Sequence, residues 1–459
     1  MAQEVELKLT LSPQAVEAFL QDAQLGEAQG QPLLLDNQYF DTPDLLLNQA
    51  HAALRIRKSQ HGYKQTLKSK GQAIAGLHQR GEWEYDIDSP ELDWSLFPKE
   101  VVPDASVKNG ILPLFKTDFQ RHVWHKHEGQ SDIELVLDQG VISSEDHSVA
   151  LCEIELELKT GRVEDLFSFA LSLSNRYPLV PCDINKAERG YQLSHPALSF
   201  FQPLDFSDLD QINVVDLLQE TLTRISRRFD GFSQQEDWWS VVVISRQIHG
   251  LLFILKSLEG QGMTLPPNIV QDWESALEPL NGMLSTARTI LALQVDDHSH
   301  SRGLTQRLLT PIAGQLNGPM TDWVNANHLG QAMLKTGQWL WQNHERLAKD
   351  SQRVLTAIQD SMNTVASRLT QMSVQDVADL TYHQAVAYLF HRFQHPASES
   401  LDKMVNGHLV IMGMVDALEH CAITDEDSRA KLASWARRLT VEQRHLQQAK
   451  AQFDLAFTF

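Results

Sequence analysis

The stretch that decides the fold of the N-terminal part reads EVELKL from Glu4 to Leu9. Charged and apolar residues alternate strictly along it. Because successive side chains of a β-strand point to opposite faces, Glu4, Glu6 and Lys8 share one face and the apolar residues share the other. This pattern predicts a strand with one face in an apolar core and one charged face.

The same alternation recurs over the first 200 residues. The further predicted strands are Ala52 to Arg57, Tyr63 to Lys68, Glu82 to Ile87, Ile133 to Asp138 and Leu151 to Leu158. Turn-forming residues such as His61-Gly62 separate most of them. We expect a helix from Pro13 to about Ala23, capped by Ser12, and another from about Val163 to Asn175. Residues 1–200 are thus predicted to form a mostly β, antiparallel domain.

The pattern changes to helical spacing in residues 205–459. The predicted helices are Asn213–Phe229, Asp237–Leu258, Asn268–Leu293, Thr321–Lys349, Val374–Phe393, Ser398–Ala422 and Thr424–Phe453. Breaks are expected at Leu265-Pro266-Pro267, Asn317-Gly318-Pro319 and His395-Pro396, and the linker at about Ser194 to Asp210. The chain is therefore predicted to be α+β, with a β domain followed by an all-α bundle of helical hairpins.

Carboxylates and cationic side chains fall on separate predicted strands. Glu153, Glu155 and Glu157 share one strand face, whereas Arg55 and Arg57 share a face of another strand. Stacked like charges repel one another unless cations neutralise them. If the sheet curls so that these faces point inward, its interior becomes a tunnel with an acidic and a basic side. Such oxygen ligands suit Mg²⁺ or Mn²⁺, and the basic side suits a polyphosphate.

The composition excludes several classes of protein. The chain has 459 residues and a formal net charge of −20, which opposes binding to nucleic acid or to an anionic membrane. Its three cysteines are widely spaced and form no metal motif. We find no signal peptide, no membrane span and no Gly-rich phosphate loop, so we expect a cytoplasmic protein with reduced thiols.

The ordered motifs of residues 1–200 resemble one family. The segment from Glu4 to Lys8 is similar to the ExExK signature of the CYTH superfamily, the triphosphate tunnel metalloenzymes. The further matches are Leu54-Arg55-Ile56-Arg57, Gln65-Thr66-Leu67-Lys68, Arg80 with Glu82 and Glu84, Phe119 with Arg121, Leu137-Asp138-Gln139-Gly140, Cys152-Glu153-Ile154-Glu155 and the stretch from Lys186 to Tyr191.

The resemblance implies a closed, eight-stranded antiparallel β tunnel that hydrolyses inorganic triphosphate to diphosphate and phosphate. It implies two divalent ions, Mg²⁺ or Mn²⁺, one bridging phosphate oxygens and one activating the attacking water. The implied metal ligands are Glu4, Glu6, Asp138, Glu153 and Glu155. The implied triphosphate-binding residues are Lys8, Arg55, Arg57, Lys68, Arg80, Arg121 and Lys186. Among these residues, Glu4, Glu6 and Lys8 are expected to be catalytic.

The helical half resembles the CHAD domain, the usual fusion partner of bacterial CYTH proteins. CHAD domains carry His- and Arg-rich helix faces that grip polyphosphate. The corresponding helix here, about Trp238 to Leu258, keeps Arg246 and His249 but has valines from Val241 to Val243 where basic residues are expected. This half is also net acidic. We therefore expect it to bind polyphosphate weakly or not at all.

Three alternative functions use the same predicted tunnel. A thiamine triphosphatase or a class IV adenylate cyclase would place an organic group at one mouth. A polyphosphate-binding module without turnover would need only the basic side, so the intact carboxylate set argues against it. The fusion to a CHAD-like half favours the inorganic substrate.

Overall fold

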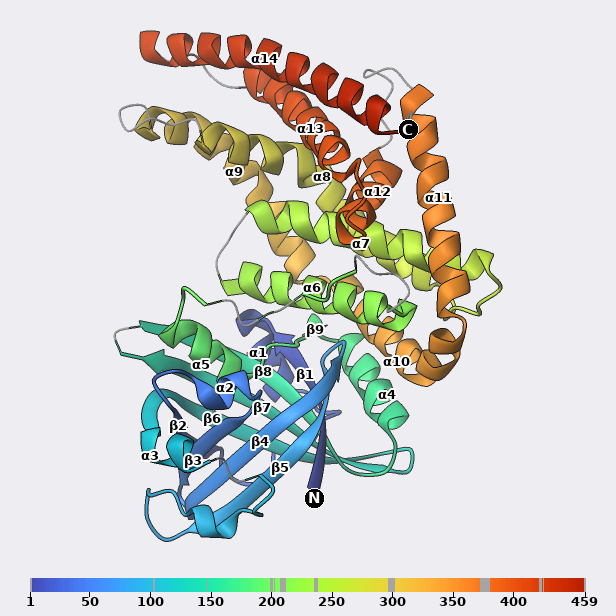
Figure 1. Cartoon of the computed structure of the whole chain (residues 1–459). Coiled ribbons are helices and arrows are strands. Elements are labelled where there is room, and N and C mark those ends of the chain that lie inside the picture. The colour runs from blue at the N-terminus through green and yellow to red at the C-terminus, as the bar shows by residue number, and fades with distance from the viewer. Residues whose placement is uncertain are drawn as a thin grey trace. The chain divides into compact units, whose positions relative to one another are not determined.

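The computed structural model describes residues 2–101, 104–145, 147–198, 201, 203–206, 212–234, 238–295, 302–371, 380–420, 423 and 425–457 (Figure 1). The chain divides into two compact units. The first comprises Met1–Pro203 and Met333–Gln338, and the second comprises Leu204–Ala332 and Trp339–Phe459.

Eight antiparallel strands close the first unit into a ring. They are β1 (Ala2–Leu11), β2 (Leu33–Asp41), β3 (Ala53–Ser59), β4 (Gly62–Ile74), β5 (Leu77–Ile87), β6 (Leu112–Glu128), β7 (Ser131–Ser144) and β8 (His147–Thr160). Their order is β5-β4-β3-β2-β6-β7-β8-β1, and β1 pairs again with β5. A ninth strand, β9 (Leu179–Pro181), pairs with the end of β1. The predicted eight-stranded tunnel is confirmed, and β9, β2 and β6 are additions to the predicted strands.

The ring is charged inside and apolar outside. On β1, Leu7 and Leu9 are fully buried on the face opposite the charged residues. The helix α4 (Val163–Ser174) contacts β1, β6, β7, β8 and β9. On β1 the apolar face is therefore buried outside the barrel, which leaves the interior for charged side chains.

Short helices complete the first unit. They are η1 (Pro13–Ala15), α1 (Val16–Leu20), α2 (Leu46–Gln49), η2 (Trp94–Leu96), α3 (Ala105–Gly110), α4 and α5 (Lys186–Ser194). The helix predicted to reach Ala23 ends at Leu20. The side chain of Ser12 makes no capping hydrogen bond, and its hydroxyl donates to the side chain of Gln14. The helix predicted from Val163 to Asn175 is confirmed as α4.

The described part of the second unit is helical. Its helices are α6 (Val214–Gln234), α7 (Trp238–Gly260), α8 (Ile269–Val295), α9 (Arg302–Val324), α10 (His328–Lys349), α11 (Ser351–Gln371), α12 (Leu380–Arg392), α13 (Ser398–His420) and α14 (Glu426–Phe457). The predicted all-α class is confirmed. Cys421 and the predicted helix starts at Asp237, Val374 and Thr424 lie outside the described residues.

Two predicted boundaries in this unit are wrong. The break expected at Asn317-Gly318-Pro319 lies inside α9, and the helix expected over Thr321–Lys349 is divided between α9 and α10. A proline removes one backbone hydrogen bond, and that loss is offset here because Leu316, Met320 and Trp323 bury their side chains along the same helix. The sequence prediction also missed α11.

The helix α7 is long and apolar enough to cross a membrane by length and composition alone. However, 78% of its most apolar 18-residue window is buried within the protein. Leu251, Ile254 and Leu255 are completely buried. Burial on this scale is typical of the central helix of a bundle.

Candidate active site

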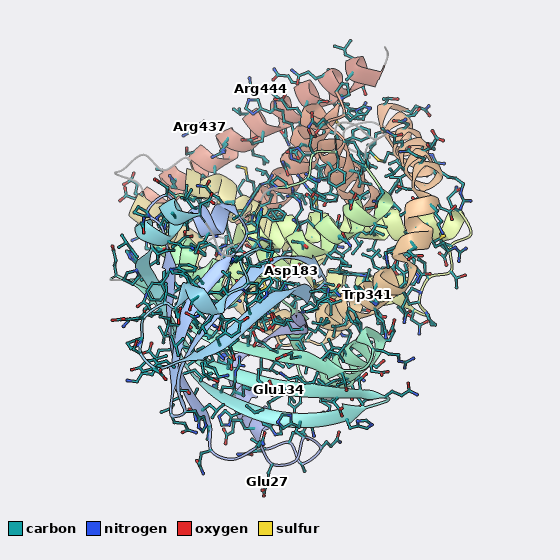
Figure 2. The ribbon with its side chains drawn as sticks, turned by 60° about the horizontal axis from the view of Figure 1, so that its bottom comes forward. Glu27, Glu134, Asp183, Trp341, Arg437 and Arg444 are labelled. Carbon is teal, nitrogen blue, oxygen red and sulfur yellow. The ribbon has the colours of Figure 1, made fainter. Side chains whose placement is uncertain are left out.

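The inward-facing charged residues of the first unit surround a cavity of about 290 Å³. Most of the predicted site residues line it: Glu4, Glu6, Lys8, Arg55, Arg57, Lys68, Arg80, Arg121, Glu155 and Lys186. Glu134, labelled in Figure 2, lines it as well. The structure therefore brings the acidic and basic strands together in one tunnel.

Asp138 and Glu153 do not line this cavity, but they belong to a buried carboxylate cluster beside it. Carboxylate oxygens of Asp138, Glu153 and Glu155 all lie within 4.8 Å of one another. The pairing of β7 with β8 places Asp138 opposite Glu153. Asp138 is 0% exposed and Glu153 is 1% exposed. Three carboxylates this close in a buried place require cations nearby.

Lys186 supplies one such cation. Its Nζ lies 2.6 Å from Asp138 Oδ2, 2.5 Å from Glu153 Oε1 and 3.0 Å from Glu155 Oε1. Lys186 is the first residue of α5, which Asn185 caps by accepting a hydrogen bond from the Glu188 amide. Burial alone would lower the pKa of Lys186, but Asp138, Glu153 and Glu155 raise it above its usual value.

The donor set of this cluster fits a divalent cation. Glu153 Oε2 is buried and has no hydrogen-bond partner among the described residues. A buried carboxylate oxygen without a donor is costly unless something positive binds it. Clustered carboxylate oxygens are the ligands that Mg²⁺ and similar hard cations prefer. The cluster therefore has both the charge and a free ligand atom for a metal.

Glu4 and Glu6 form the second acidic part of the tunnel, on β1. Lys68 Nζ lies 2.7 Å from Glu4 Oε1, and Arg80 Nε lies 2.9 Å from Glu4 Oε2. Arg80 Nη2 lies 2.5 Å from Glu6 Oε1. Burial would raise the pKa of Glu4, but Lys68 and Arg80 hold it well below its usual range. Glu4 is therefore ionised and available as an oxygen ligand at neutral pH.

Lys8 joins the two acidic groups. Its ammonium lies 3.3 Å from Glu6 Oε2 and also contacts Glu155 Oε1. Burial would lower the pKa of Lys8, but Glu155 and Glu6 raise it above its usual value. Lys8 therefore stays charged although only 3% of its surface is exposed.

The opposite wall of the tunnel carries uncompensated positive charge. Arg57 has no carboxylate within 4.0 Å among the described residues, and its Nε donates to Asn37 Oδ1 at 2.8 Å. Asn37 is fixed in turn, because its Nδ2 donates to the carbonyl and hydroxyl oxygens of Thr117. Burial, together with Arg55 and Arg121, lowers the pKa of Arg57 to about 9. An anion bound beside Arg57 would relieve the repulsion between its guanidinium and those of Arg55 and Arg121.

Arg55 and Arg121 complete the basic wall. Arg55 Nη2 lies only at the limit of ion pairing, 4.0 Å from Glu82 and 3.9 Å from Glu84. Arg121 is held firmly, with Nη2 at 2.6 Å from Asp138 Oδ2 and 2.9 Å from Glu155 Oε2. Arg121 therefore links the basic wall to the carboxylate cluster.

The sequence prediction did not select several residues of the tunnel wall. They are Tyr39, Thr66, Glu82, Glu84, Glu134, Glu157 and Lys159. The period-2 pattern had placed Glu157 on the same strand face as Glu153 and Glu155, but Glu157 was not assigned to the site. Asn37 and Tyr39 also alternate on one face of β2, but β2 itself was not predicted.

A second cavity of about 910 Å³ adjoins the first and shares Ala53, Lys68 and Arg80 with it. Residues of α2 and α5 line it together with Asp183, which is labelled in Figure 2. The tunnel thus opens beside α5 into a larger space.

Comparison with known proteins gives one family match. Residues 2–191 match the CYTH domain. The inorganic triphosphatase of Haemophilus influenzae is 37% identical over 199 residues, which are 42% of this chain and 55% of that protein. The chain thus spans about half the length of this curated relative.

Solved structures that this chain resembles at low identity include two CYTH-sized proteins. One is a protein from Hippeastrum described as an adenylyl cyclase candidate with a dominant triphosphatase activity, with 23% identity and a TM-score of 0.33. It covers 41% of this chain and 95% of its own. Another is an adenylate cyclase candidate from Bacillus halodurans, with 22% identity, a TM-score of 0.27 and coverage of 38% and 91%. The residues that match the CYTH domain, 2–191, include all eight strands of the closed ring.

Proposed function

We propose that the N-terminal unit hydrolyses inorganic triphosphate to diphosphate and phosphate with the help of divalent metal ions. The observation that carries this proposal is the arrangement of the tunnel. A buried carboxylate cluster with a free oxygen, Glu153 Oε2, lies on one side, and an unpaired Arg57 lies on the other. The 37% identity to an inorganic triphosphatase supports the same conclusion.

The metal ligands in this proposal are Glu4, Glu6, Asp138, Glu153 and Glu155, and they would hold two ions of Mg²⁺ or Mn²⁺. Such ions neutralise phosphate oxygens and lower the pKa of a bound water when they are present. The chain's own part is to keep these carboxylates ionised. Lys68, Arg80 and Arg121 do so by lying within hydrogen-bond distance of them.

The phosphate chain would lie along the basic residues Lys8, Arg55, Arg57, Lys68, Arg80, Arg121 and Lys186. Planar guanidinium groups bind phosphate oxygens in a bidentate way. As the bond to the leaving group breaks, negative charge grows on the phosphate oxygens, and fixed cations in a tunnel that excludes bulk water stabilise it. Glu4, Glu6 and Lys8 act nearest the reacting group in this proposal.

The second cavity supports a second candidate. Its volume of about 910 Å³ would accept an organic group attached to a triphosphate. A thiamine triphosphatase or a class IV adenylate cyclase would use it in that way. A polyphosphate-binding module without turnover would leave the carboxylate cluster without a role.

A panel that measures release of both phosphate and diphosphate tests these functions, because a cyclase releases diphosphate rather than phosphate from ATP. The substrates are inorganic triphosphate, thiamine triphosphate, ATP and long-chain polyphosphate, each with Mg²⁺, with Mn²⁺ and with EDTA. We expect the highest kcat/KM for inorganic triphosphate and complete loss of release in EDTA. A higher kcat/KM for thiamine triphosphate or ATP would favour the organic substrates, and full activity in EDTA would refute the metal-dependent reaction.

We also propose how the whole chain is divided and where it is located. A CYTH domain spans residues 1–200, a CHAD-like domain spans residues 205–459, and the protein is cytoplasmic. The expected weak binding of polyphosphate has structural support. Arg246 already donates to Gln384 and Asn406 at 3.1 Å and 2.8 Å and pairs with Asp402. These contacts leave little of its charge for a polyanion.

A further inference from the structure

The helical unit contains its own cavity, of about 700 Å³, between α7, α8, α13 and α14. Its apolar wall includes Val410, Leu446 and Ala449. Trp239 and Arg288 lie on the wall formed by α7 and α8. The cavity therefore combines a large apolar surface with a cationic group.

Arg288 has no carboxylate within 4.0 Å among the described residues, although Asp402 acts on it from farther away. The side chain makes no hydrogen bond or ion pair with the described residues, and its Nε is buried without an acceptor. Its Cζ lies 4.8 Å from the centre of the Trp239 ring. Burial, together with the nearby Arg246, lowers the pKa of Arg288 to about 10. Burying the Nε of a guanidinium without an acceptor is costly, so an anion bound beside Arg288 would stabilise it.

The other cations of this cavity are already paired. Lys403 Nζ lies 2.6 Å from Glu399 Oε1, and Arg438 Nε lies 3.2 Å from Glu442 Oε1. Arg288 is therefore the one cation of the described cavity wall that has no carboxylate partner. A ligand with a single negative charge would balance the one positive charge of Arg288. Glu442, which lines the same cavity, would repel a polyanion.

We propose that this cavity binds a carboxylate that carries an apolar chain. The carboxylate accepts two hydrogen bonds from the Arg288 guanidinium, a geometry that suits this pair of groups. The apolar chain lies against Val410, Leu446 and Ala449. Stacking on Trp239 keeps the guanidinium plane in place. This site is independent of the tunnel and of the triphosphatase proposal.

Calorimetric titration of the whole chain with decanoate, below its micellar concentration and in EDTA, tests the proposal. We expect one decanoate per chain, and at least tenfold weaker binding by Arg288→Gln, which keeps a polar side chain but removes the charge. Arg437→Gln is the control. Arg437 lies on α14, one of the helices around the cavity, but it is exposed and does not line the cavity (Figure 2). Decanol, without the charge, and acetate, without the chain, should each bind at least tenfold more weakly than decanoate.

Thermal unfolding without ligand gives a readout that does not depend on the choice of decanoate. Arg288→Met removes a half-buried charge that has no ion pair and keeps an unbranched apolar side chain, so the melting temperature should rise by about 2 °C or more. A lower melting temperature would mean that Arg288 supports the fold, and would overturn the proposal. Equal decanoate binding by Arg288→Gln, or triphosphate that displaces decanoate from the wild type, would overturn it as well.

Discussion

The ammonium nitrogen of Lys186 lies 2.6 Å from Oδ2 of Asp138, at the centre of the carboxylates that we assign to the metal. A lysine at this place acts as an internal counter-ion. Together with Arg121 and Lys8 it neutralises the buried cluster of Asp138, Glu153 and Glu155, and it competes with a metal for the same oxygens. The tunnel can therefore stay folded without metal, and metal binding has to draw these oxygens away from Lys186.

Replacing Lys186 by methionine should make the protein depend on metal for its stability. Without the ammonium, three buried carboxylates repel one another, so the melting temperature in EDTA should fall by several degrees. Added Mn²⁺ should then raise it by more than it does in the wild type. Differential scanning fluorimetry over a Mn²⁺ titration measures both values. Lys159→Met is the control, since Lys159 is a 40% exposed lysine of the same tunnel, and an equal Mn²⁺ response in both variants would contradict the counter-ion role.

Glu6→Gln and Glu153→Gln should each reduce turnover of inorganic triphosphate by at least about 100-fold. Each change removes a proposed ligand charge and keeps the shape of the side chain. Steady-state phosphate release with saturating Mg²⁺ measures the effect, and circular dichroism checks the fold. Glu91→Gln serves as the control because Glu91 is exposed. Turnover equal to that of the wild type in both variants would remove these residues from the site.

Arg57→Ala should weaken triphosphate binding by at least about tenfold even without metal, because no carboxylate of the described residues lies within 4.0 Å of Arg57. Lys68→Ala should weaken binding less, since Lys68 is already paired with Glu4. Calorimetric titration with triphosphate in EDTA measures both affinities. Lys58→Ala is the matched control, an exposed cation of the same strand β3. An unchanged affinity in Arg57→Ala would place the phosphate chain elsewhere.

Stability should fall in acid through Glu4. Lys68 and Arg80 outweigh burial and hold the folded pKa of Glu4 well below 4.5, its ordinary value. A carboxylate whose pKa is lower in the folded than in the unfolded state stabilises the fold above about pH 4.5. This contribution is lost as the pH falls further. The melting temperature of Glu4→Gln should therefore be lower than that of the wild type at pH 6, and the difference should shrink towards pH 3.5. A difference that stays constant over this range would contradict the assigned pKa.

A chain that ends at Pro203 should keep triphosphatase activity, because every proposed ligand precedes that residue. It should melt at a lower temperature than the whole protein. The first unit includes Met333–Gln338, and Gly337 lies close to Ala75 and Phe167. Removing this segment exposes both apolar side chains. Loss of kcat in a truncated chain that remains folded would show that the reaction needs the helical half.

The sequence predicted the parts of this structure that local patterns encode. Charged residues alternate with apolar ones on β1 and β8, so the period-2 signal gave both the strands and their charged faces. The strand β2 escaped because Asp36, Asn37 and Gln38 interrupt any alternation. The polar Asn37 is nevertheless completely buried, where it holds Arg57. Its role becomes visible only when β6 brings Thr117 beside it.

The sequence predicted which residues form the site, but not how their side chains are arranged relative to one another. The resemblance assigned Lys186 to the phosphate, which stays a prediction, but it did not predict that its ammonium also contacts Asp138 and Glu153. This position depends on how α5 begins beside β7 and β8, which no local pattern specifies. The break expected at Pro319 failed for a similar reason, because tertiary packing of α9 outweighs the local effect of proline.

The closure of the ring by β1 has a consequence for synthesis on the ribosome. Lys8 meets Glu155 across the pairing of β1 with β8, and the two residues are 147 positions apart in the chain. Of the strands of the ring, β1 is synthesised first. Its second edge therefore stays unpaired until β8 has been synthesised. Until then the nascent chain carries an open edge and a row of unneutralised glutamates. Contacts of such long range slow folding, so this domain should complete its fold only after translation has passed β8.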